Sequence, residues 1–309
     1  MIGESLALAA MLMFATNILV TKAASARLDV GTGFVISVVV NLLVAALAFA
    51  IELALRGDRI EWDLTGVVLF ALAGVCATYL GRFFFFGAIA KLGATKASLF
   101  HVSSPAFTAL IAWVFIGESL RWPTVVAIVA TMIGLLLIIV PSFDMLLGRG
   151  ESARAAMALG AKIKVWLASG FVVGVGATLA YSVGNVLRGA SVRQWNEPIA
   201  GAMLGAAAAL LLQLAFGSHR QLSKRLRDAD RAGKRLYAVG GVLTITAQMC
   251  MIASMRYIPV AVATVITLCT PLIVIPASYW LMRSEERIGL RTLAGAALTI
   301  AGMAIIVLR

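Results

Sequence analysis

One arginine of this sequence stands where a charged side chain is expensive. Arg82 follows the uncharged apolar run 64–81 and precedes the segment FFFFGAIA, which continues a helical pattern for two more turns. At about 1.5 Å per residue, Lys91 lies about 13 Å further on, so a membrane-spanning helix would carry Arg82 well inside the bilayer. A guanidinium held there can pair with a carboxylate or phosphate of a ligand, which makes Arg82 a candidate substrate-binding residue. Snorkelling of the side chain to the interface is the alternative.

Two further apolar segments, 97–117 and 257–282, carry the next candidate residues. Each is preceded or opened by a glycine or proline, continues with small and hydroxylated residues, and contains an interior proline, Pro105 or Pro271. A proline inside a helix frees a backbone carbonyl and bends the helix, so both prolines are candidate gating residues. The polar side chains near them are candidate hydrogen-bonding partners of a substrate: His101, Ser103, Ser104 and Thr267.

The titratable and aromatic residues narrow the chemistry. No Asp or Glu lies in the interior of an expected membrane span. Glu118 and Glu285 come only after the two proline-containing segments. Proton-driven pumps commonly relay protons through buried carboxylates, so we expect a facilitator or exchanger. His101 is the one expected intramembrane group that titrates near neutral pH and is the one route to proton coupling, with packing as its alternative. Tyr79 and Tyr181 are candidates for lining an amphipathic cavity, although aromatic residues also fill cores.

The composition indicates the element class that must position these residues. The 309 residues are 61% hydrophobic and 13% charged, whereas soluble domains are about 45–50% apolar and about 25% charged. Ten uncharged runs are each long enough to cross a bilayer, once the fourth begins at residue 97. We therefore expect an all-α integral membrane protein with ten transmembrane helices. The runs are 5–21, 30–51, 64–81, 97–117, 122–143, 165–187, 198–218, 236–255, 257–282 and 292–308.

The net charge of +12 is assigned to loops rather than to a nucleic-acid surface. The odd-numbered loops hold 18 of the 26 Lys and Arg residues, and the opposite side holds seven, with Arg82 left out and Arg188 counted in a loop. The positive-inside rule then places the odd-numbered loops in the cytoplasm and both termini outside, in a plasma or inner membrane. The three cysteines show no CxxC spacing, so no disulfide, metal site or cofactor is expected.

An internal repeat divides the chain into two halves. We place a first five-helix half at 1–141, a polar linker at 142–164 and a second five-helix half at 165–309. Five helices per half give the second half the opposite orientation, and such a 5+5 inverted repeat is typical of secondary transporters with a substrate site near the midplane. Gln248 then shares a cavity with Arg82, or bonds a neighbouring helix instead. At offsets of 166–168 residues the aligned pairs are Arg82 with Gln248, His101 with Thr267, Pro105 with Pro271, Gly134 with Gly302, and Asn17 with Asn185.

Three segments resemble the drug/metabolite transporter superfamily, EamA type: FATNILVTK, then KLGATKASL followed by a proline and GESL, and IASMRYIPVAVATV followed by a proline and a glutamate. The resemblance covers both halves and implies a ten-helix, 5+5 inverted-repeat carrier that moves small metabolites, often outward. The second half departs from the family pattern at Ser284–Glu285, where Gly-Glu is usual. The first helix departs from it at Phe14–Ala15, where Trp-Gly is common.

These features together predict a secondary transporter, an exporter or exchanger of small polar or amphipathic metabolites such as amino acids. Two halves would rock about a central site, with Arg82 on a substrate anion and neutral hydrogen bonds from Gln248, Ser103, Ser104 and Thr267. A lipid or lipid-linked-sugar flippase of the same superfamily and a non-transporting membrane scaffold are the alternatives. An enzyme is not expected, because the spans lack paired carboxylates, a His–Asp set and metal ligands. The expected partners are a small-molecule substrate and the bilayer, and a monomer is compatible with this interpretation.

Overall fold

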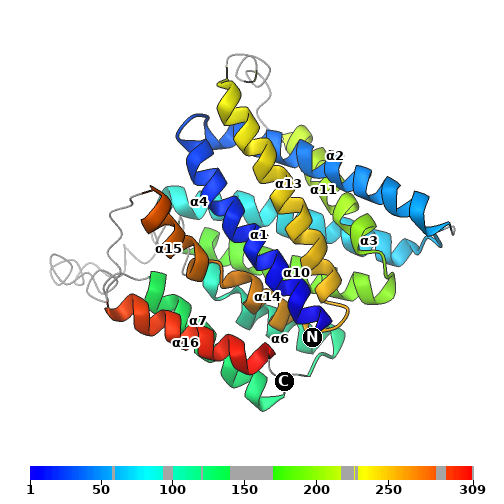
Figure 1. The fold of residues 1–309 in the computed structure, drawn as a ribbon. Helices are drawn as coiled ribbons and strands as arrows, with labels where there is room; N and C mark the ends of the chain where they lie inside the picture. The colour runs from blue at the N-terminus through cyan, green and yellow to red at the C-terminus, as the bar shows by residue number, and fades with distance from the viewer. Residues whose placement is uncertain are drawn as a thin grey trace, which may run out of the picture.

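The computed structural model of the chain is a bundle of helices (Figure 1). It describes residues 1–57, 60–92, 100–119, 121–139, 170–216, 226, 229–282 and 290–307, and these residues contain no strand. The predicted linker 142–164, Gly93 and Glu285 lie outside the described residues. The elements are α1 (Ile2–Ser25), α2 (Val30–Arg56), α3 (Leu64–Ala73), the π-helical segment η1 (Gly74–Leu80), α4 (Gly81–Leu92), α6 (Ser104–Ile116), α7 (Trp122–Ile139), α10 (Phe171–Gln194), α11 (Pro198–Phe216), α13 (Arg231–Ser254), α14 (Val260–Leu268), α15 (Pro271–Met282) and α16 (Leu290–Val307).

Several of these helices are suited to a bilayer. By length and composition, five stretches of the described chain can cross a membrane: Ile2–Ser25, Gly31–Arg56, Leu64–Phe85, Pro198–Phe216 and Arg231–Ser254. Four shorter apolar helices accompany them: Phe100–Ile116, Trp122–Leu137, Val260–Val274 and Leu293–Gly302. The expected all-helical membrane protein is therefore confirmed, and the count of ten spans stays a prediction.

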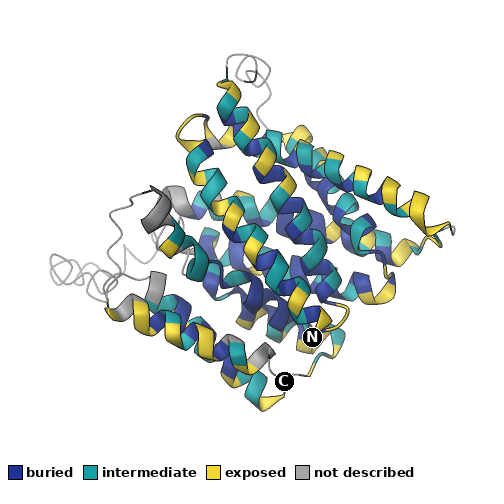
Figure 2. Cartoon of the chain, viewed as in Figure 1, coloured by how far each residue is buried: buried dark blue, intermediate teal, exposed yellow. Residues whose placement is uncertain are grey.

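The bundle places apolar side chains outside and polar ones inside. Leu47, Trp113 and Phe115 are exposed on the outer surface, as side chains that face lipid hydrocarbon should be. Buried residues concentrate in the centre of the bundle around α10 and α14, while exposed residues follow α16 and the outer part of α2 (Figure 2). The buried polar residues include Asn185, Arg188 and Gln248. A polar interior inside an apolar shell is what a membrane protein with an internal site requires.

Polar residues and glycines begin and end the apolar helices. The Asp29 carboxylate accepts from the Thr32 amide at 2.9 Å at the start of α2, and Asp63 accepts from the Gly66 amide at 3.0 Å at the start of α3. Such side chains satisfy amides that have no partner in the first helical turn. Gly57 ends α2 with φ 70°, a left-handed conformation that favours glycine. These helix boundaries are therefore set by local residues.

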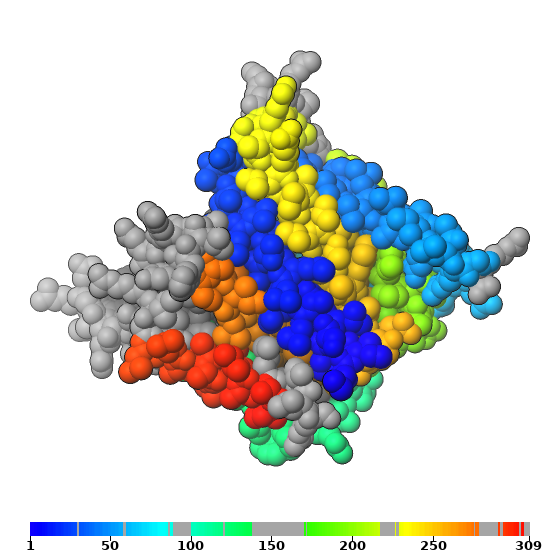
Figure 3. All heavy atoms as spheres, in the orientation of Figure 1, coloured from blue at the N-terminus to red at the C-terminus, as the bar shows by residue number. Residues whose placement is uncertain are grey.

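The helices pair across the two halves of the sequence. The first helix of each half packs on the third of the other: α1 lies along α13, while α10 lies along α3, η1 and α4. The second helices, α2 and α11, pack together, and so do the last helices, α7 and α16 (Figure 1). On the face shown in Figure 3, α1 crosses between α13 on one side and α14 and α15 on the other. This exchange of partners forms one central space between the halves.

A reciprocal contact between α7 and α16 supports the repeat alignment. A Cβ added to Gly134 would lie 2.3 Å from Thr299 Oγ1, and one added to Gly302 would lie 2.3 Å from Thr131 Oγ1. Only a glycine fits so close an approach. Thr131 lies three residues before Gly134 and Thr299 three residues before Gly302, so the two contacts are equivalent under the repeat. The two helices are therefore related by a local two-fold, as the alignment of Gly134 with Gly302 predicts.

Candidate functional site

A cavity of about 540 Å³ lies between the halves. Its walls come from α1, η1, α4, α6, α10, α13 and α14, together with the residues just before α6 and α15. The volume falls within the range of about 300–1,000 Å³ that small-molecule sites occupy. Its described polar lining consists of Asn17, Thr78, Arg82, His101, Ser104, Tyr181, Asn185, Arg188, Gln248, Thr264, Thr267 and Thr270.

Repeat-related residues meet in this cavity. Arg82 and Gln248 both line it, as do Asn17 with Asn185 and His101 with Thr267. Positions that the repeat alignment pairs therefore line one shared space, and their role in binding stays a prediction. Two of the predicted binding residues lie elsewhere: the Ser103 hydroxyl donates to the Phe100 carbonyl at 2.6 Å, and Tyr79 stacks on Phe83 with ring centroids 6.4 Å apart. Neither Ser103 nor Tyr79 is among the described residues of the lining.

The two predicted gating prolines follow breaks in their helices rather than bends. Pro105 is the second residue of α6, after a turn at Ser103. Pro271 is the first residue of α15, after a turn at Cys269 and Thr270. The prediction that each proline bends its helix from an interior position is therefore wrong, and the gating role of both prolines stays a prediction. A proline fits the first turn of a helix, where an amide hydrogen has no partner to lose.

Hydroxyl groups of α10 satisfy backbone carbonyls at the first of these breaks. Thr178 Oγ1 donates to the Phe100 carbonyl at 2.7 Å, and Ser182 Oγ donates to the Ser104 carbonyl at 3.0 Å. Both hydroxyls are buried, and a buried carbonyl without a partner is strongly unfavourable. The broken segment is thus held against α10 by side-chain bonds, in addition to local bonds such as that from the Ser103 amide to the Phe100 carbonyl.

Arg188 is the most deeply buried charge of the cavity, and it was not among the predicted binding residues. Its side chain is 8% exposed, and the guanidinium donates only to neutral oxygens among the described residues. These acceptors are Asn185 Oδ1 at 3.3 Å, Thr78 Oγ1 at 3.3 Å and Gln248 Oε1 at 3.2 Å. Since the uncharged run ended at 187, Arg188 was counted in a loop. α10 instead continues to Gln194, which carries Arg188 inside the bundle.

Arg82 enters the same cavity from α4, which packs beside α10. It follows η1, whose last bond, from the Gly81 amide to the Cys76 carbonyl, spans five residues and widens the turn. The guanidinium lies over the Phe34 ring, 5.1 Å from its centroid, which is a cation–π contact. Tyr181 lines the same cavity as Arg82 and Arg188. The two cations therefore face one compartment from separate helices.

His101 contacts aromatic rings instead of a charged partner. Its ring centroid is 4.8 Å from that of Tyr181 and 5.4 Å from that of Phe85. Its Nδ1 atom is buried and has no hydrogen-bond partner among the described residues. His101 thus presents a free polar atom beside the cavity, and its role in binding or proton coupling stays a prediction.

The described lining contains no carboxylate, so its electrostatic character is positive. Arg82 and Arg188 form no ion pair with any described Asp or Glu. Charges removed from water are strongly unfavourable unless they gain a partner. No group of three His, Cys, Asp or Glu side chains within the described chain is placed to hold a metal ion. The chemistry that this arrangement offers is recognition of an anion.

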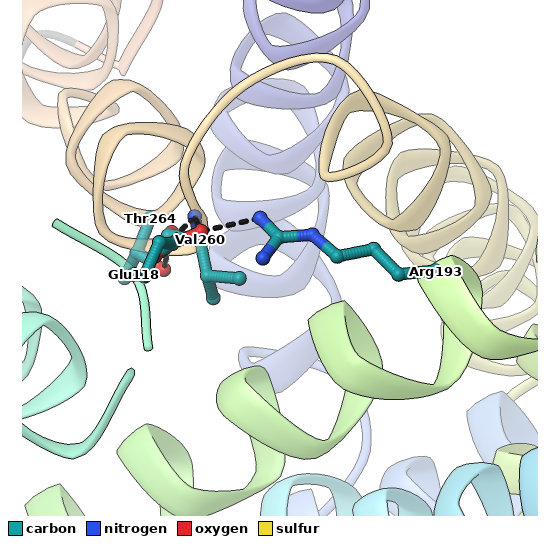
Figure 4. A network of polar contacts seen from close by, with 4 residues as sticks. All are labelled: Glu118, Arg193, Val260 and Thr264. Atoms are coloured by element: carbon teal, nitrogen blue, oxygen red, sulfur yellow. Dashed lines mark hydrogen bonds and ion pairs between the residues drawn. The ribbon is translucent and has the colours of Figure 1, made fainter. Parts of the chain in front are cut away.

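Glu118 joins Arg193 and Val260 in a network of polar contacts at one end of the cavity (Figure 4). It follows α6, and its carboxylate accepts from the Val260 amide at 3.0 and 3.1 Å while forming an ion pair with Arg193 of α10. Val260 is the first residue of α14, so Glu118 caps a helix of the other half. We call Glu118, Arg193 and Val260 the Glu118 clamp. It joins the α6 and α10 wall of the cavity to the α14 wall.

A second set of contacts ties the halves at the same end. Arg56 Nη1 donates to Glu197 Oε1 at 2.5 Å, linking the end of α2 to the start of α11. Trp195 is buried, and its Nε1 donates to the Glu61 carbonyl at 2.9 Å. Both contacts lie just beyond the end of α10, close to the Glu118 clamp in sequence and in the fold. This end of the bundle is therefore held by charges and by a buried aromatic residue.

Comparison with known proteins agrees with this architecture. The model of the EamA-like transporter family matches residues 1–140 and 164–308. The chain belongs to the EamA-like transporter family. No curated protein matches it. Among solved structures, a chain described only as "Crystal structure of protein" has a TM-score of 0.69 at 16% sequence identity, covering 99% of this chain and 97% of that chain. At that identity the likeness shows the fold alone.

Family membership confirms the resemblance found in the sequence and the expected membrane transporter class. Within this EamA-family chain, six of the eight predicted binding residues line the cavity. They are Arg82, Gln248, His101, Ser104, Thr267 and Tyr181. Their placement is observed, whereas their contact with a substrate stays a prediction.

Proposed function

We propose that this EamA-family chain is a secondary carrier that moves a small polar metabolite by alternating access, with the central cavity as its substrate site. The observation that carries the proposal is the polar cavity between two repeat-related halves, lined by equivalent positions of each. A site at the interface of repeats is reached from either side when the halves move about it.

The helix breaks and the Glu118 clamp supply the moving parts of this mechanism. The breaks near Ser103 and Thr270 interrupt helical bonding beside the cavity, so short segments can change angle there without breaking a complete helix. The clamp holds α6, α10 and α14 together at one end. In our proposal it closes that end, and its opening accompanies passage of the substrate.

The charge distribution suggests which end is closed. The clamp lies at the end where α10 and α13 finish and α1 begins, which is the side of the even-numbered loops. By the positive-inside rule that side is outside the cell. Removing Arg188 from the loop count increases the difference in Lys and Arg residues between the two sides, because one of the seven basic residues counted on that side lies inside the bundle. We therefore propose a conformation closed to the outside and a role as exporter or exchanger.

Exchange by purified protein in lipid vesicles tests the proposal. Vesicles loaded with an unlabelled metabolite should accumulate its labelled form, using succinate, glycerol 3-phosphate, lactate, leucine and putrescine as probes. Arg82→Ala should abolish the exchange while leaving membrane insertion and monodispersity intact. Arg256→Ala removes an exposed arginine outside the cavity and should keep the wild-type rate. Normal exchange by Arg82→Ala would contradict the site, and lipid translocation without any metabolite exchange would favour a flippase.

A further inference from the structure

We infer that the cavity selects a small organic anion carrying two negative charges, such as a dicarboxylate or a phosphate monoester. The inference rests on the proposed carrier function and narrows its substrate class. Two arginines face the cavity, and its described lining has no carboxylate. A ligand with two negative charges therefore neutralises the compartment, whereas a singly charged anion leaves one cation without a counter-charge.

The hydrogen bonds of Arg188 within the described chain supply no negative charge, which points to a ligand that brings one. Its guanidinium has five N–H donors, and its three hydrogen bonds, to the side-chain oxygens of Thr78, Asn185 and Gln248 at 3.2–3.3 Å, engage three of them. Charge-assisted bonds to an oxyanion are shorter, about 2.7–2.9 Å, and about twice as strong as bonds between neutral groups. The three neutral oxygens orient the guanidinium without neutralising its positive charge. A carboxylate or phosphate entering the cavity can form charge-assisted hydrogen bonds with the Arg188 guanidinium, which these neutral oxygens cannot do.

The second charge binds near Arg82, on the helix that packs beside α10. Thr78, which Arg188 contacts, lies four residues before Arg82 on the continuous η1–α4 helix. Four residues correspond to a rise of about 6 Å. Arg188 therefore contacts the neighbouring η1–α4 helix about one turn from the position from which Arg82 extends. Tyr181 lines the cavity together with both arginines. This spacing suits one small molecule that contacts both cations.

The same charges disfavour the amino acids that the sequence suggested as substrates. A zwitterion brings an ammonium group into a compartment that already holds two cations, and the described lining offers no carboxylate for it. Like charges in a poorly solvated site repel strongly. The aromatic rings of Phe85 and Tyr181 could attract a cation, but a cation–π contact of about 0.5–2 kcal/mol does not offset two nearby guanidinium groups. Specificity here arises from repulsion as well as from attraction.

Binding to the full-length protein in detergent tests the inference. We expect succinate or glycerol 3-phosphate to raise the melting temperature and to give a calorimetric titration, with lactate at least tenfold weaker and leucine without effect. Comparison of succinate with glycerol 3-phosphate distinguishes a dicarboxylate from a phosphate ligand. Arg188→Gln should weaken the better dianion by about ten- to a hundredfold, because one charge-assisted contact is lost. Arg188→Lys should keep part of the affinity, and Arg256→Gln should keep all of it.

Several outcomes would overturn the inference. Binding of leucine without binding of either dianion would reverse the selectivity, and equal binding of lactate would show that one charge suffices. Dianion binding that Arg188→Gln leaves unchanged in a monodisperse protein would place the ligand elsewhere. Absence of any dianion binding to folded wild-type protein would also refute it. Leucine exchange by vesicles would leave the carrier function standing, whereas dianion binding without exchange of any probe would leave the inference standing and refute the carrier.

Discussion

Two arginines on α10, five residues apart, have opposite surroundings. Arg193 is partly exposed and pairs with the Glu118 carboxylate at the end of the cavity. Arg188 is buried inside the cavity and bonds only neutral oxygens among the described residues. Five residues advance a helix by about 7.5 Å and turn it by about 140°, which is enough to move an arginine from the clamp to the cavity.

The difference shows how one residue type serves two purposes. An arginine that a carboxylate neutralises holds helices together, as Arg193 does between α10 and α14. An arginine buried without a counter-charge makes the empty site less stable and favours an anion from outside. The stability forgone at Arg188 is recovered when a ligand binds, because binding to the folded state stabilises it. The clamp therefore holds the architecture, and the cavity retains its charge for the substrate.

The largest effect should follow from giving Arg188 the partner that Arg193 already has. Gln248 Oε1 lies 3.2 Å from Arg188 Nη2, so Gln248→Glu places a carboxylate beside that guanidinium with almost no change in shape. We expect a higher melting temperature and about a hundredfold loss of dianion affinity, equivalent to about 2.7 kcal/mol. Calorimetric titration and a thermal melt measure the two effects. Gln248→Met is the control without added charge, and it should lose less affinity. Unchanged dianion affinity in Gln248→Glu would show that Arg188 does not bind the ligand.

An intermediate effect is expected at the clamp. Glu118→Gln removes the charge that pairs with Arg193 and caps α14 at Val260, and loss of charge-assisted bonds typically lowers the stability by about 1–3 kcal/mol. Because the variant keeps the cavity, dianion affinity should change far less than it does in Gln248→Glu. A cysteine introduced at Thr264, in the cavity lining beside the clamp, should react faster with a water-soluble maleimide in the Glu118→Gln background. Equal labelling rates with and without the Glu118→Gln substitution would show that the clamp does not close this end.

The smallest effect is expected at a third arginine. Arg27 lies 3.6 Å from Asp230 on the opposite end of the bundle, and both side chains are largely exposed. Exposed ion pairs contribute little to stability, so Arg27→Gln should change the melting temperature less than Glu118→Gln does. A shift as large as that of Glu118→Gln would contradict the ranking of the arginines by their burial.

The Asp230 carboxylate gives this exposed pair a pH dependence. Amides of Gly233 and Ala232 at the start of α13, and more weakly Arg27, hold the pKa of Asp230 below its ordinary value. A lowered native pKa means that the contribution is fully present above the unfolded value of about 3.9 and is lost as the pH falls through the native value. Asp230→Asn should therefore narrow the difference in melting temperature between pH 6 and pH 3. An unchanged difference would contradict the capping role.

The sequence predicted those parts of the fold that local patterns determine. The low charge predicted a helical membrane protein, and the repeat brought Arg82 and Gln248 to one cavity from positions 166 residues apart. Ser104 and Thr267 were found because polar side chains are rare in apolar runs. Arg188 was left out of the predicted site and counted with the loop charges because a charge ends an apolar run by definition, although the helix itself continues past it.

The remaining differences depend on tertiary contacts that no local pattern reports. At the break near Ser103, distant groups contribute bonds to the interrupted backbone, as Thr178 does for Phe100 and Ser182 for Ser104. The sequence placed Glu118 at the end of a segment but did not reveal that its carboxylate caps a helix 142 residues later. Tyr79 and Ser103 shared the polarity of the true lining residues and differ from them only in direction. Such details require the packing of the two halves to be known.

Exchange of labelled succinate and glycerol 3-phosphate by reconstituted vesicles, compared among wild type, Arg188→Gln and Arg256→Gln, tests the role of the unpaired arginine most directly. We expect wild type and Arg256→Gln to exchange at least one of these dianions at equal rates. Arg188→Gln should fall at least tenfold below them while remaining folded and inserted. Exchange by Arg188→Gln at the wild-type rate would contradict the assignment of this charge to the substrate.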